Sequence, residues 1–481
     1  MLKIYKLNIV QKNNAKNILW TLLIINILFL FFYEIYLKSV LLNHFNNVKD
    51  IIDKSYYSQI FSFLEYPLIF ISVILLLIII FYKQVKIFFD KIKVDRTFMI
   101  FIISLNVIMQ IIILLTIHTV PISDSRFYIE AGHRLFLTGS YVTPGGKLTA
   151  FWPVGLPEYL AFLESLTNHY LLVAKIMNLI FSSLFILVLY KLFKEKLSQK
   201  ELALFLIAFV LFPNNLFSVN TILADYPFAF LLWLAIFLSL SPNLKIWGII
   251  SIAVLLGILS YLRPIGLLLP LIFAIYLFNK YSLKSSVRKI VVLFSVFLII
   301  LFPWIYRNYN VFNTFVPIST SGGSNFLMGN HVGSSGGVNF NFFLQDSLSE
   351  TQVSNDAYFR AINDIAEQPV ESIVRLPKKI FFTYYRGDSS LTWSLKDTEN
   401  KIPSVVLSFV FFINNYFFYL IIFISILCVL TKKDFIKDSK LKYFLFSIYI
   451  YFILIVLIYV GSERYLIPLF PVHFYLASKY F

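Results

Sequence analysis

The chain has 481 residues, of which 59% are hydrophobic and only 14% are charged, against about 25% charged in a typical soluble domain. Its apolar residues come in runs of about 18–20, the length that crosses a hydrocarbon core of ~30 Å. These features exclude an ordinary soluble enzyme and predict an all-α polytopic membrane protein. The net charge of +16 does not indicate a nucleic-acid partner, because lysines and arginines cluster in short loops between apolar runs.

The apolar runs predict about twelve transmembrane helices. They lie near residues 18–37, 66–82, 98–117, 171–190, 202–219, 226–241, 246–261, 265–279, 290–306, 404–430, 443–460 and 465–479. A single helix over residues 246–279 would be about 51 Å long at 1.5 Å per residue, too long for the bilayer. We therefore expect a turn at Arg263-Pro264, since proline lacks the amide hydrogen that a helix interior needs.

Basic residues set the expected orientation. They concentrate in the N-terminal tail and near residues 83–96, 191–200, 280–289 and 432–442, which all fall on one side when twelve spans are counted. By the positive-inside rule this side is cytoplasmic. We expect both termini in the cytoplasm and the protein in the cell (plasma or inner) membrane. The single cysteine, Cys428, excludes an internal disulfide.

Two loops on the other, extracytoplasmic side are too long to be simple connectors. Together with the spans they predict N-terminal spans at 1–97, a transmembrane catalytic core at 98–306 with the first loop at 118–170, the second loop at 307–403, and C-terminal spans at 404–481. Both loops contain tryptophan, phenylalanine and helical patterns, so we expect them to be folded.

Short interfacial helices are expected in both loops. In the first loop, residues 123–136 predict a helix with Ser123 as its N-cap and Asp124 in its first turn. In the second loop, a helix is expected near residues 356–367. The basic and aromatic residues of 370–385 then predict an amphipathic helix that lies in the membrane interface.

Three acidic residues are candidates for chemistry. Asp124 begins a helix inside a long loop and could act as a general base, or it could simply favour the helix dipole by ~0.3–1 kcal/mol. Asp225 lies at the outer mouth of a span, as a site residue or as a helix cap. Glu130 and His133 have the spacing of two metal ligands, but no partner pair is evident, and a solvated helix face is the simpler interpretation.

Three arginines form the second group of candidates. Arg263, Arg307 and Arg464 each lie at the end of a span on the expected outer side. A guanidinium group suits phosphate because its donors match two oxygens at once, whereas snorkelling to the interface is the alternative role. Three such positions on the side opposite the positive-inside bias favour a phosphate site.

These segments occur in an order that resembles the GT-C superfold of membrane glycosyltransferases, in particular the protein O-mannosyltransferase and aminoarabinose transferase branch (glycosyltransferase family 39-like). The resemblance covers most of the chain from about Asn106. The matching segments are 124–141, Trp152-Pro153-Val154-Gly155-Leu156-Pro157, Ala224-Asp225-Tyr226-Pro227, Tyr261-Leu262-Arg263-Pro264, Pro303-Trp304 with Arg307-Asn308-Tyr309, Phe315-Val316-Pro317, Gly322-Gly323 to Gly329-Asn330, and Glu463-Arg464-Tyr465 with Pro468. The chain departs from the pattern in two extra N-terminal spans and a single acidic residue at 124.

The resemblance implies a GT-C-like fold and an enzyme that transfers a hexosyl or pentosyl group at the outer face of the membrane. The donor would be a polyprenyl-phosphate-linked sugar, and the acceptor a glycan, a lipid or a protein. Asp124 would take the acceptor proton in an inverting displacement, with Asp225 and Glu130 as second acidic candidates. No cofactor is expected, and the reaction is expected to be metal-independent or weakly metal-dependent.

The same resemblance gives the arginines a role. Arg263, Arg307 and Arg464 would hold the phosphate leaving group, which needs charge neutralisation rather than protonation. Weaker candidates for this role are Lys147, Lys378 and Lys379.

Three other functions stay open from the sequence. A polyprenyl-linked glycan polymerase or ligase is an enzyme of related architecture and would be separated by its product, a ladder of single additions or a block. A lipid-linked oligosaccharide flippase predicts charged residues buried in mid-span, of which Glu34 is one of few. A non-catalytic scaffold needs no carboxylate at the outer mouth.

Overall fold

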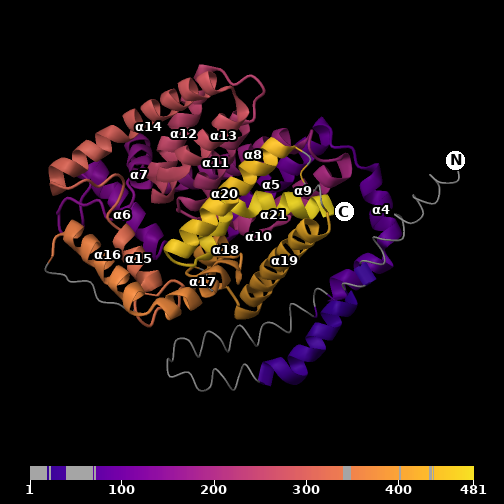
Figure 1. The fold of residues 1–481 in the computed structure, drawn as a ribbon. Coiled ribbons are helices and arrows are strands. Elements are labelled where there is room, and N and C mark those ends of the chain that lie inside the picture. Colours follow the sequence, from indigo (N-terminus) through magenta and orange to yellow (C-terminus); the bar gives the residue numbers. More distant parts are fainter. Residues whose placement is uncertain are drawn as a thin grey trace.

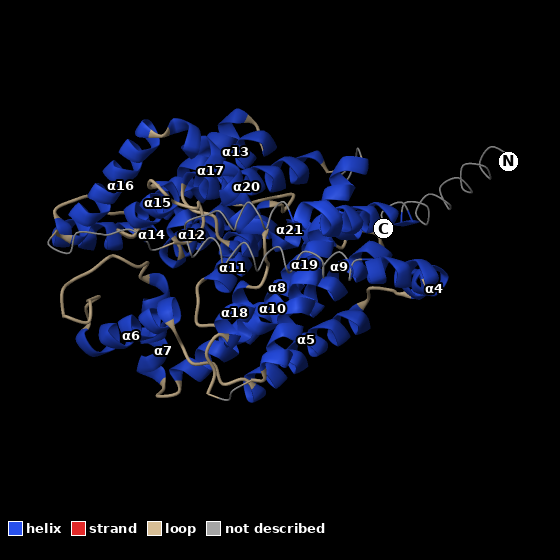
Figure 2. Cartoon of the chain, turned by 90° about the horizontal axis from the view of Figure 1, so that it is seen from below, coloured by secondary structure: helices blue, strands red, loops and turns tan. Residues whose placement is uncertain are grey.

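The computed structural model describes residues 19–20, 23–39, 69, 72–339, 348–399, 402–432, 436 and 438–480. Within these ranges the regular structure is helical, and β-pairing is limited to isolated bridges (Figures 1 and 2). The predicted all-α class is therefore confirmed. The predicted spans at 18–37 and 66–82 lie partly outside the described residues.

In the part of the chain that the structure describes, fewer helices than predicted have the length and apolar composition of a membrane span. Among the described residues, five helices are long and apolar enough to cross a membrane, or six if one pair bent by 53° counts as a single span. The five are α5 (Arg96–Thr116), α8 (Tyr170–Phe193), α14 (Leu283–Phe312), α19 (Ser404–Thr431) and α20 (Ser439–Ile458). The bent pair consists of α9 (Gln199–Leu211) and the segment Pro213–Asn220, which contains α10 (Pro213–Phe217). The chain is thus a multi-pass membrane protein, but the count of about twelve is not confirmed.

Several predicted spans are helices shorter than the five named above. They are α11 (Asp225–Ser239), α12 (Ile246–Leu262), η3 (Pro264–Leu268) with α13 (Leu269–Lys280), and η4 (Glu463–Leu469) with α21 (Phe470–Tyr480). The 15 residues of α11 rise only about 22 Å at 1.5 Å per residue. A helix that is apolar all round is buried, and Trp233 in α11 is 0% exposed. Many apolar residues of the sequence therefore pack against other helices inside the bundle.

The predicted break at Arg263-Pro264 is confirmed. α12 ends at Leu262, Arg263 has an extended backbone (φ −149°, ψ 132°), and Pro264 begins η3. A Cβ atom on Gly155 would lie 2.7 Å from the backbone carbon and oxygen of Tyr261. Only glycine permits this approach of the first loop to the end of α12, so the loop and Arg263 are held together.

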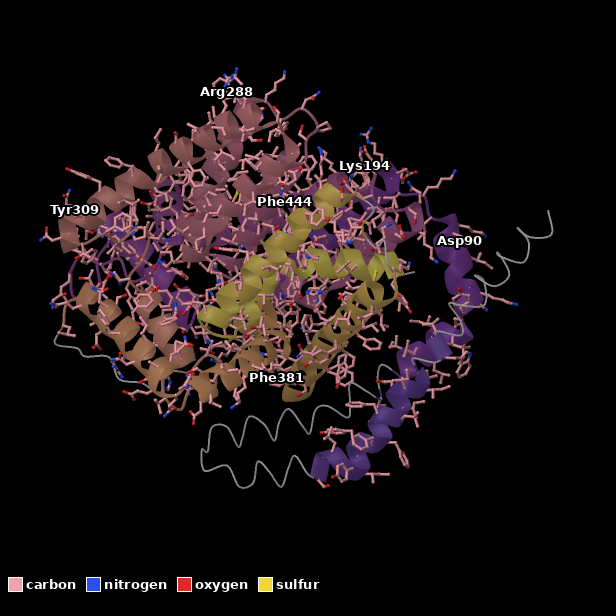
Figure 3. All side chains as sticks on the ribbon, in the orientation of Figure 1. Asp90, Lys194, Arg288, Tyr309, Phe381 and Phe444 are labelled. Carbon is pink, nitrogen blue, oxygen red and sulfur yellow. The ribbon has the colours of Figure 1, made fainter. Side chains whose placement is uncertain are left out.

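The two long loops are folded, and most of their helices gather at one end of the molecule (Figure 1). The first loop contains α6 (Ser123–Thr138) and α7 (Gly155–Leu166), and the second contains α15 (Gly322–Asn330), α16 (Glu350–Glu367), α17 (Pro369–Tyr384) and α18 (Ser389–Leu395). These bounds confirm the three loop helices predicted from the sequence. Figure 3 shows Tyr309 at the end where α6 and α16 lie, and Lys194 toward the other end.

The predicted cap of α6 is wrong. The N-cap residue is Ile122, no side chain caps the helix, and Ser123 is its first residue with a φ of 45°. This left-handed backbone is uncommon for residues other than glycine, so the serine side chain cannot adopt the usual capping geometry. Asp124 nevertheless lies in the first turn, as expected.

Candidate active site

Four charged residues from distant segments meet in one place, which we call the charge cluster. They are Asp124 of α6, Asp225 of α11, Arg263 after α12 and Arg464 of η4. Arg464 Nη1 lies 2.5 Å from Asp124 Oδ2, and Arg464 Nη2 lies 2.8 Å from Asp225 Oδ2. Arg263 Nη2 pairs with Asp225 Oδ1. The two positive and two negative charges leave the cluster without net charge.

Arg464 is the centre of the charge cluster. Besides its Nη contacts, its Nε donates to both carboxylate oxygens of Asp225, at 3.2 and 3.3 Å. The guanidinium carbon lies 5.4 Å from the centre of the Trp393 ring, a cation–π contact. Each of its three nitrogens therefore contacts a carboxylate, and Arg464 fixes Asp124 and Asp225 relative to each other.

The two aspartates have different environments. The side chain of Asp225 is 5% exposed and both its oxygens accept from guanidinium groups. Burial acts to raise the pKa of Asp225, but the charges of Arg263 and Arg464 outweigh it and hold the pKa below its ordinary value. Asp124 is 16% exposed, and among the described residues only Arg464 forms a hydrogen bond or ion pair with its carboxylate, through Oδ2. Asp124 Oδ1 thus remains able to accept a proton.

Aromatic side chains line one side of the cluster. Tyr128 lies one helical turn after Asp124 and is 5% exposed. Its ring packs edge-on against Trp152 at 5.8 Å, and Phe127 packs on the same indole at 5.3 Å. Burial and the Asp124 charge raise the pKa of the Tyr128 hydroxyl, so it stays a neutral hydrogen-bond donor. Tyr128 is not among the site residues predicted from the sequence, although its i, i+4 spacing from Asp124 indicates that the two side chains share a face of the helix.

Arg307 does not join the charge cluster. Its Nη1 donates to the carbonyl oxygen of Thr149 at 2.8 Å, its Nη2 donates to that of Tyr141 at 3.0 Å, and the group lies over the Trp304 ring. Arg307 therefore ties the first loop to α14. In its present position it is a poor match for a phosphate shared with Arg263 and Arg464.

A cavity of about 430 Å³ lies between the first loop and α14, and no residue of the charge cluster lines it. Arg307, Glu158 and Trp304 line it together with Tyr261, which precedes Arg263 by two residues.

The other candidates lie apart from the charge cluster. Glu130 is on an exposed face of α6 and pairs with Arg126 at 2.7 Å, which lowers its pKa. Lys147 and Lys378 are exposed. Lys379 is 0% exposed, and its ammonium group donates to amide and carbonyl oxygens rather than facing the cluster.

The structure offers no assembled metal site in the described ranges, where no three His, Cys, Asp or Glu residues come together. His133 pairs with Glu164 at 2.6 Å instead of forming a site with Glu130. The carboxylates of Asp124 and Asp225 could be metal ligands, but the guanidinium of Arg464 lies between them.

No family model matches the sequence, and curated proteins give no significant match. Among solved structures, the fold is similar to the oligosaccharyltransferase AglB from Archaeoglobus fulgidus in complex with an inhibitory peptide and a dolichol-phosphate, at 14% identity over 80% of this chain and 50% of AglB, with a TM-score of 0.48. It is also similar to ArnT from Cupriavidus metallidurans bound to undecaprenyl phosphate, at 12% identity over 80% of this chain and 77% of ArnT, with a TM-score of 0.39.

The chain spans about half the length of AglB. AglB and ArnT are both membrane glycosyltransferases of the GT-C fold, the superfold whose motifs the sequence resembles. Because the TM-scores lie below 0.5, the function proposed below rests on the residues of the charge cluster.

Proposed function

We propose that the chain is an inverting membrane glycosyltransferase that moves a sugar from a polyprenyl-phosphate donor to a glycan, lipid or protein acceptor at the outer face of the membrane. The observation that supports it is the charge cluster. A carboxylate with a free oxygen, Asp124, is linked through Arg464 and Asp225 to Arg263. Displacement at the anomeric carbon of a phosphate-linked sugar requires both a base for the acceptor and a cation for the leaving group.

Asp124 is the proposed general base. Its Oδ1 accepts the proton of the acceptor hydroxyl while its Oδ2 stays bound to Arg464. The acceptor oxygen then forms a bond to the anomeric carbon from the face opposite the phosphate, which inverts that centre. Asp225 is less suited to this step because both of its oxygens already accept from arginines.

Arg263 is the proposed first partner of the leaving group. The bond between the anomeric carbon and the phosphate oxygen breaks with its electron pair, so polyprenyl phosphate departs with one more negative charge. Within the described part of the chain, the Arg263 guanidinium is bonded only through Nη2, which leaves other donors for phosphate oxygens. Arg464 is the second candidate for binding the phosphate, because its nitrogens already bind the two aspartates. Arg307 is the third candidate, because its N–H groups already donate to carbonyl oxygens.

The transporter alternative gains no support from the one mid-span charge that the sequence offered for it. Glu34, which the sequence offered as a mid-span charge, lies on an exposed helix face and pairs with Lys38 at 3.2 Å. It does not line a path through the bundle.

The test is transfer by the purified protein in lipid nanodiscs. Short-chain polyprenyl-phosphate hexoses and pentoses are offered with a membrane extract as the acceptor source, and release of polyprenyl phosphate is followed by mass spectrometry. We expect release with one donor by the wild type and its loss in Asp124→Asn. No release with any donor would contradict the proposal, and a ladder of products would identify a polymerase.

A further inference from the structure

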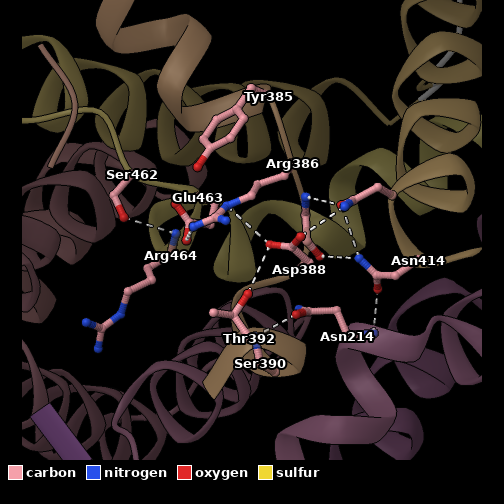
Figure 4. A network of polar contacts seen from close by, with 12 residues as sticks. Asn214, Tyr385, Arg386, Asp388, Ser390, Thr392, Asn414, Ser462, Glu463 and Arg464 are labelled. Carbon is pink, nitrogen blue, oxygen red and sulfur yellow. Dashed lines mark hydrogen bonds and ion pairs between the residues drawn. The ribbon is translucent and has the colours of Figure 1, made fainter. Parts of the chain in front are cut away.

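A second ion-pair network lies beside the charge cluster, which we call the Arg386 network (Figure 4). Arg386, between α17 and α18, contacts Glu463 of η4 through Nη2 at 3.1 Å and Asp388 through Nε at 3.3 Å. Asp388 is 2% exposed and also accepts from Asn415 Nδ2 at 2.9 Å. The carboxylates of Glu463 and Asp388 together therefore fix the position of Arg386.

The network touches the charge cluster through two consecutive residues. Glu463 and Arg464 follow each other in η4, yet their side chains have different partners: Glu463 pairs with Arg386, whereas Arg464 pairs with Asp124 and Asp225. Figure 4 shows the Arg464 guanidinium directed away from the Arg386 network. The Glu463 side chain is only 12% exposed, so without Arg386 its charge would be left poorly hydrated beside the segment that carries Arg464.

The short helix α18 contacts both Arg386, which is the partner of Glu463, and Arg464. Asp388 is its N-cap and holds Arg386, while the Trp393 ring faces the guanidinium of Arg464. The helix is itself anchored to the bundle, because Asn214 Oδ1 accepts from the Ser390 amide at 2.7 Å. The second loop thus contacts Arg464 through Trp393, and the first loop contacts it through Asp124.

We propose that Arg386 is a positioning residue that keeps the Glu463 carboxylate away from Arg464, so that Arg464 stays bound to Asp124 and Asp225. Without Arg386, Glu463 loses its cationic partner in a poorly hydrated place. It then draws the Arg464 guanidinium toward itself, and Asp124 loses the contact that orients it. For its catalytic readout the inference rests on the proposed function.

The experiment compares five variants with the wild type. Arg386→Met should lower transfer on the order of 10- to 100-fold, the usual cost of a displaced catalytic group. Arg386→Lys should lower it less, because it keeps the charge. Glu463→Gln should keep most activity, and Arg386→Met/Glu463→Gln should recover about tenfold over Arg386→Met, because the competing carboxylate is gone. Lys396→Met, an exposed site at the end of α18, is the matched control and should behave as the wild type.

Recovery in the double variant separates positioning from simple structural support. A double variant no more active than Arg386→Met would overturn the proposal. If the wild type itself shows no transfer, the proposed function has failed, and the inference is judged by thermal unfolding in detergent. Arg386→Met should then lower the unfolding midpoint and the added Glu463→Gln should raise it again; equal midpoints for the single and double variants would overturn it.

Discussion

Arg464 Nη1 lies 2.5 Å from Asp124 Oδ2, although the two residues are 340 positions apart in the chain. This contact joins the first loop helix to the segment before the last helix. It uses one oxygen of the carboxylate and leaves the other one open, so the same interaction that orients Asp124 also decides which oxygen can take a proton.

Asp124→Asn should separate a catalytic role from a structural one. Asparagine keeps the shape and still accepts a hydrogen bond from Arg464, so the unfolding free energy should change by about 1 kcal/mol. It cannot take the acceptor's proton, so transfer should fall by ~10²–10⁴. The rate is measured per amount of membrane-inserted protein. Full activity in Asp124→Asn together with inactivity in Asp225→Asn would transfer the base role to Asp225.

Asp225→Asn should act first on stability. It leaves two guanidinium groups beside one neutral amide at a site that is 5% exposed, and loss of one partner from a buried ion pair costs about 3–5 kcal/mol. The thermal midpoint in detergent should therefore drop further than in Asp124→Asn. Similar midpoints for the two variants would show that Asp225 is not the main counter-ion of the arginines.

The acid dependence of stability tests the same residue. Because the pKa of Asp225 is lower in the folded state than its ordinary value of 3.8, the unfolded state binds more protons, and the contribution to stability is lost as pH falls through the lowered pKa. The difference in midpoint between the wild type and Asp225→Asn should thus stay constant above that ordinary value and shrink only below it. A difference that already shrinks between pH 7 and pH 5 would contradict the assignment.

Arg263→Ala should weaken donor use more than Arg307→Ala. Loss of a charge-assisted bond to phosphate costs about 1.5–3 kcal/mol, roughly 10- to 100-fold in the donor KM. Arg307→Ala should instead lower the unfolding midpoint, because its carbonyl contacts hold the first loop. Donor titrations and thermal unfolding of both variants measure this. A larger increase of the donor KM in Arg307→Ala than in Arg263→Ala would instead assign phosphate binding to Arg307.

Gly155→Ala tests the packing of the first loop against the end of α12, which positions Arg263. The new Cβ would lie 2.7 Å from the backbone of Tyr261, and forced overpacking of this kind costs typically about 1–3 kcal/mol. Transfer and midpoint should both fall. Gly145→Ala is the control, because its nearest neighbour, Thr143 Oγ1, would be 3.9 Å away. Equal behaviour of the two variants would mean that the end of α12 is free to move.

Helix positions were largely predictable from the sequence, whereas membrane crossings were not. Apolar runs and the proline at 264 indicate where helices lie, because both effects depend only on the nearby sequence. The same runs do not reveal whether a helix meets lipid or protein, and α11 shows the difference, since it is surrounded by its neighbours and Trp233 is fully buried. The turn at Arg263 was predictable because bilayer thickness limits helix length.

The site was predictable as a set of residues but not as a set of contacts. Asp124, Asp225, Arg263 and Arg464 stood out as charges at span ends, but which carboxylate meets which guanidinium is decided by packing between distant segments. Arg307 has the same local signature as Arg464, so only the fold separates them. Arg386 and Trp393 belong to a loop without a motif, and no local pattern indicated their contact with η4.

The balance of two positive and two negative charges in the cluster has a kinetic consequence. A site without net charge exerts little long-range attraction, so it does not steer anionic molecules from solution. A lipid-anchored donor would reach it by lateral diffusion in its leaflet. Its capture rate should then follow the donor's surface density in the membrane and change little with ionic strength, since salt screens only long-range fields.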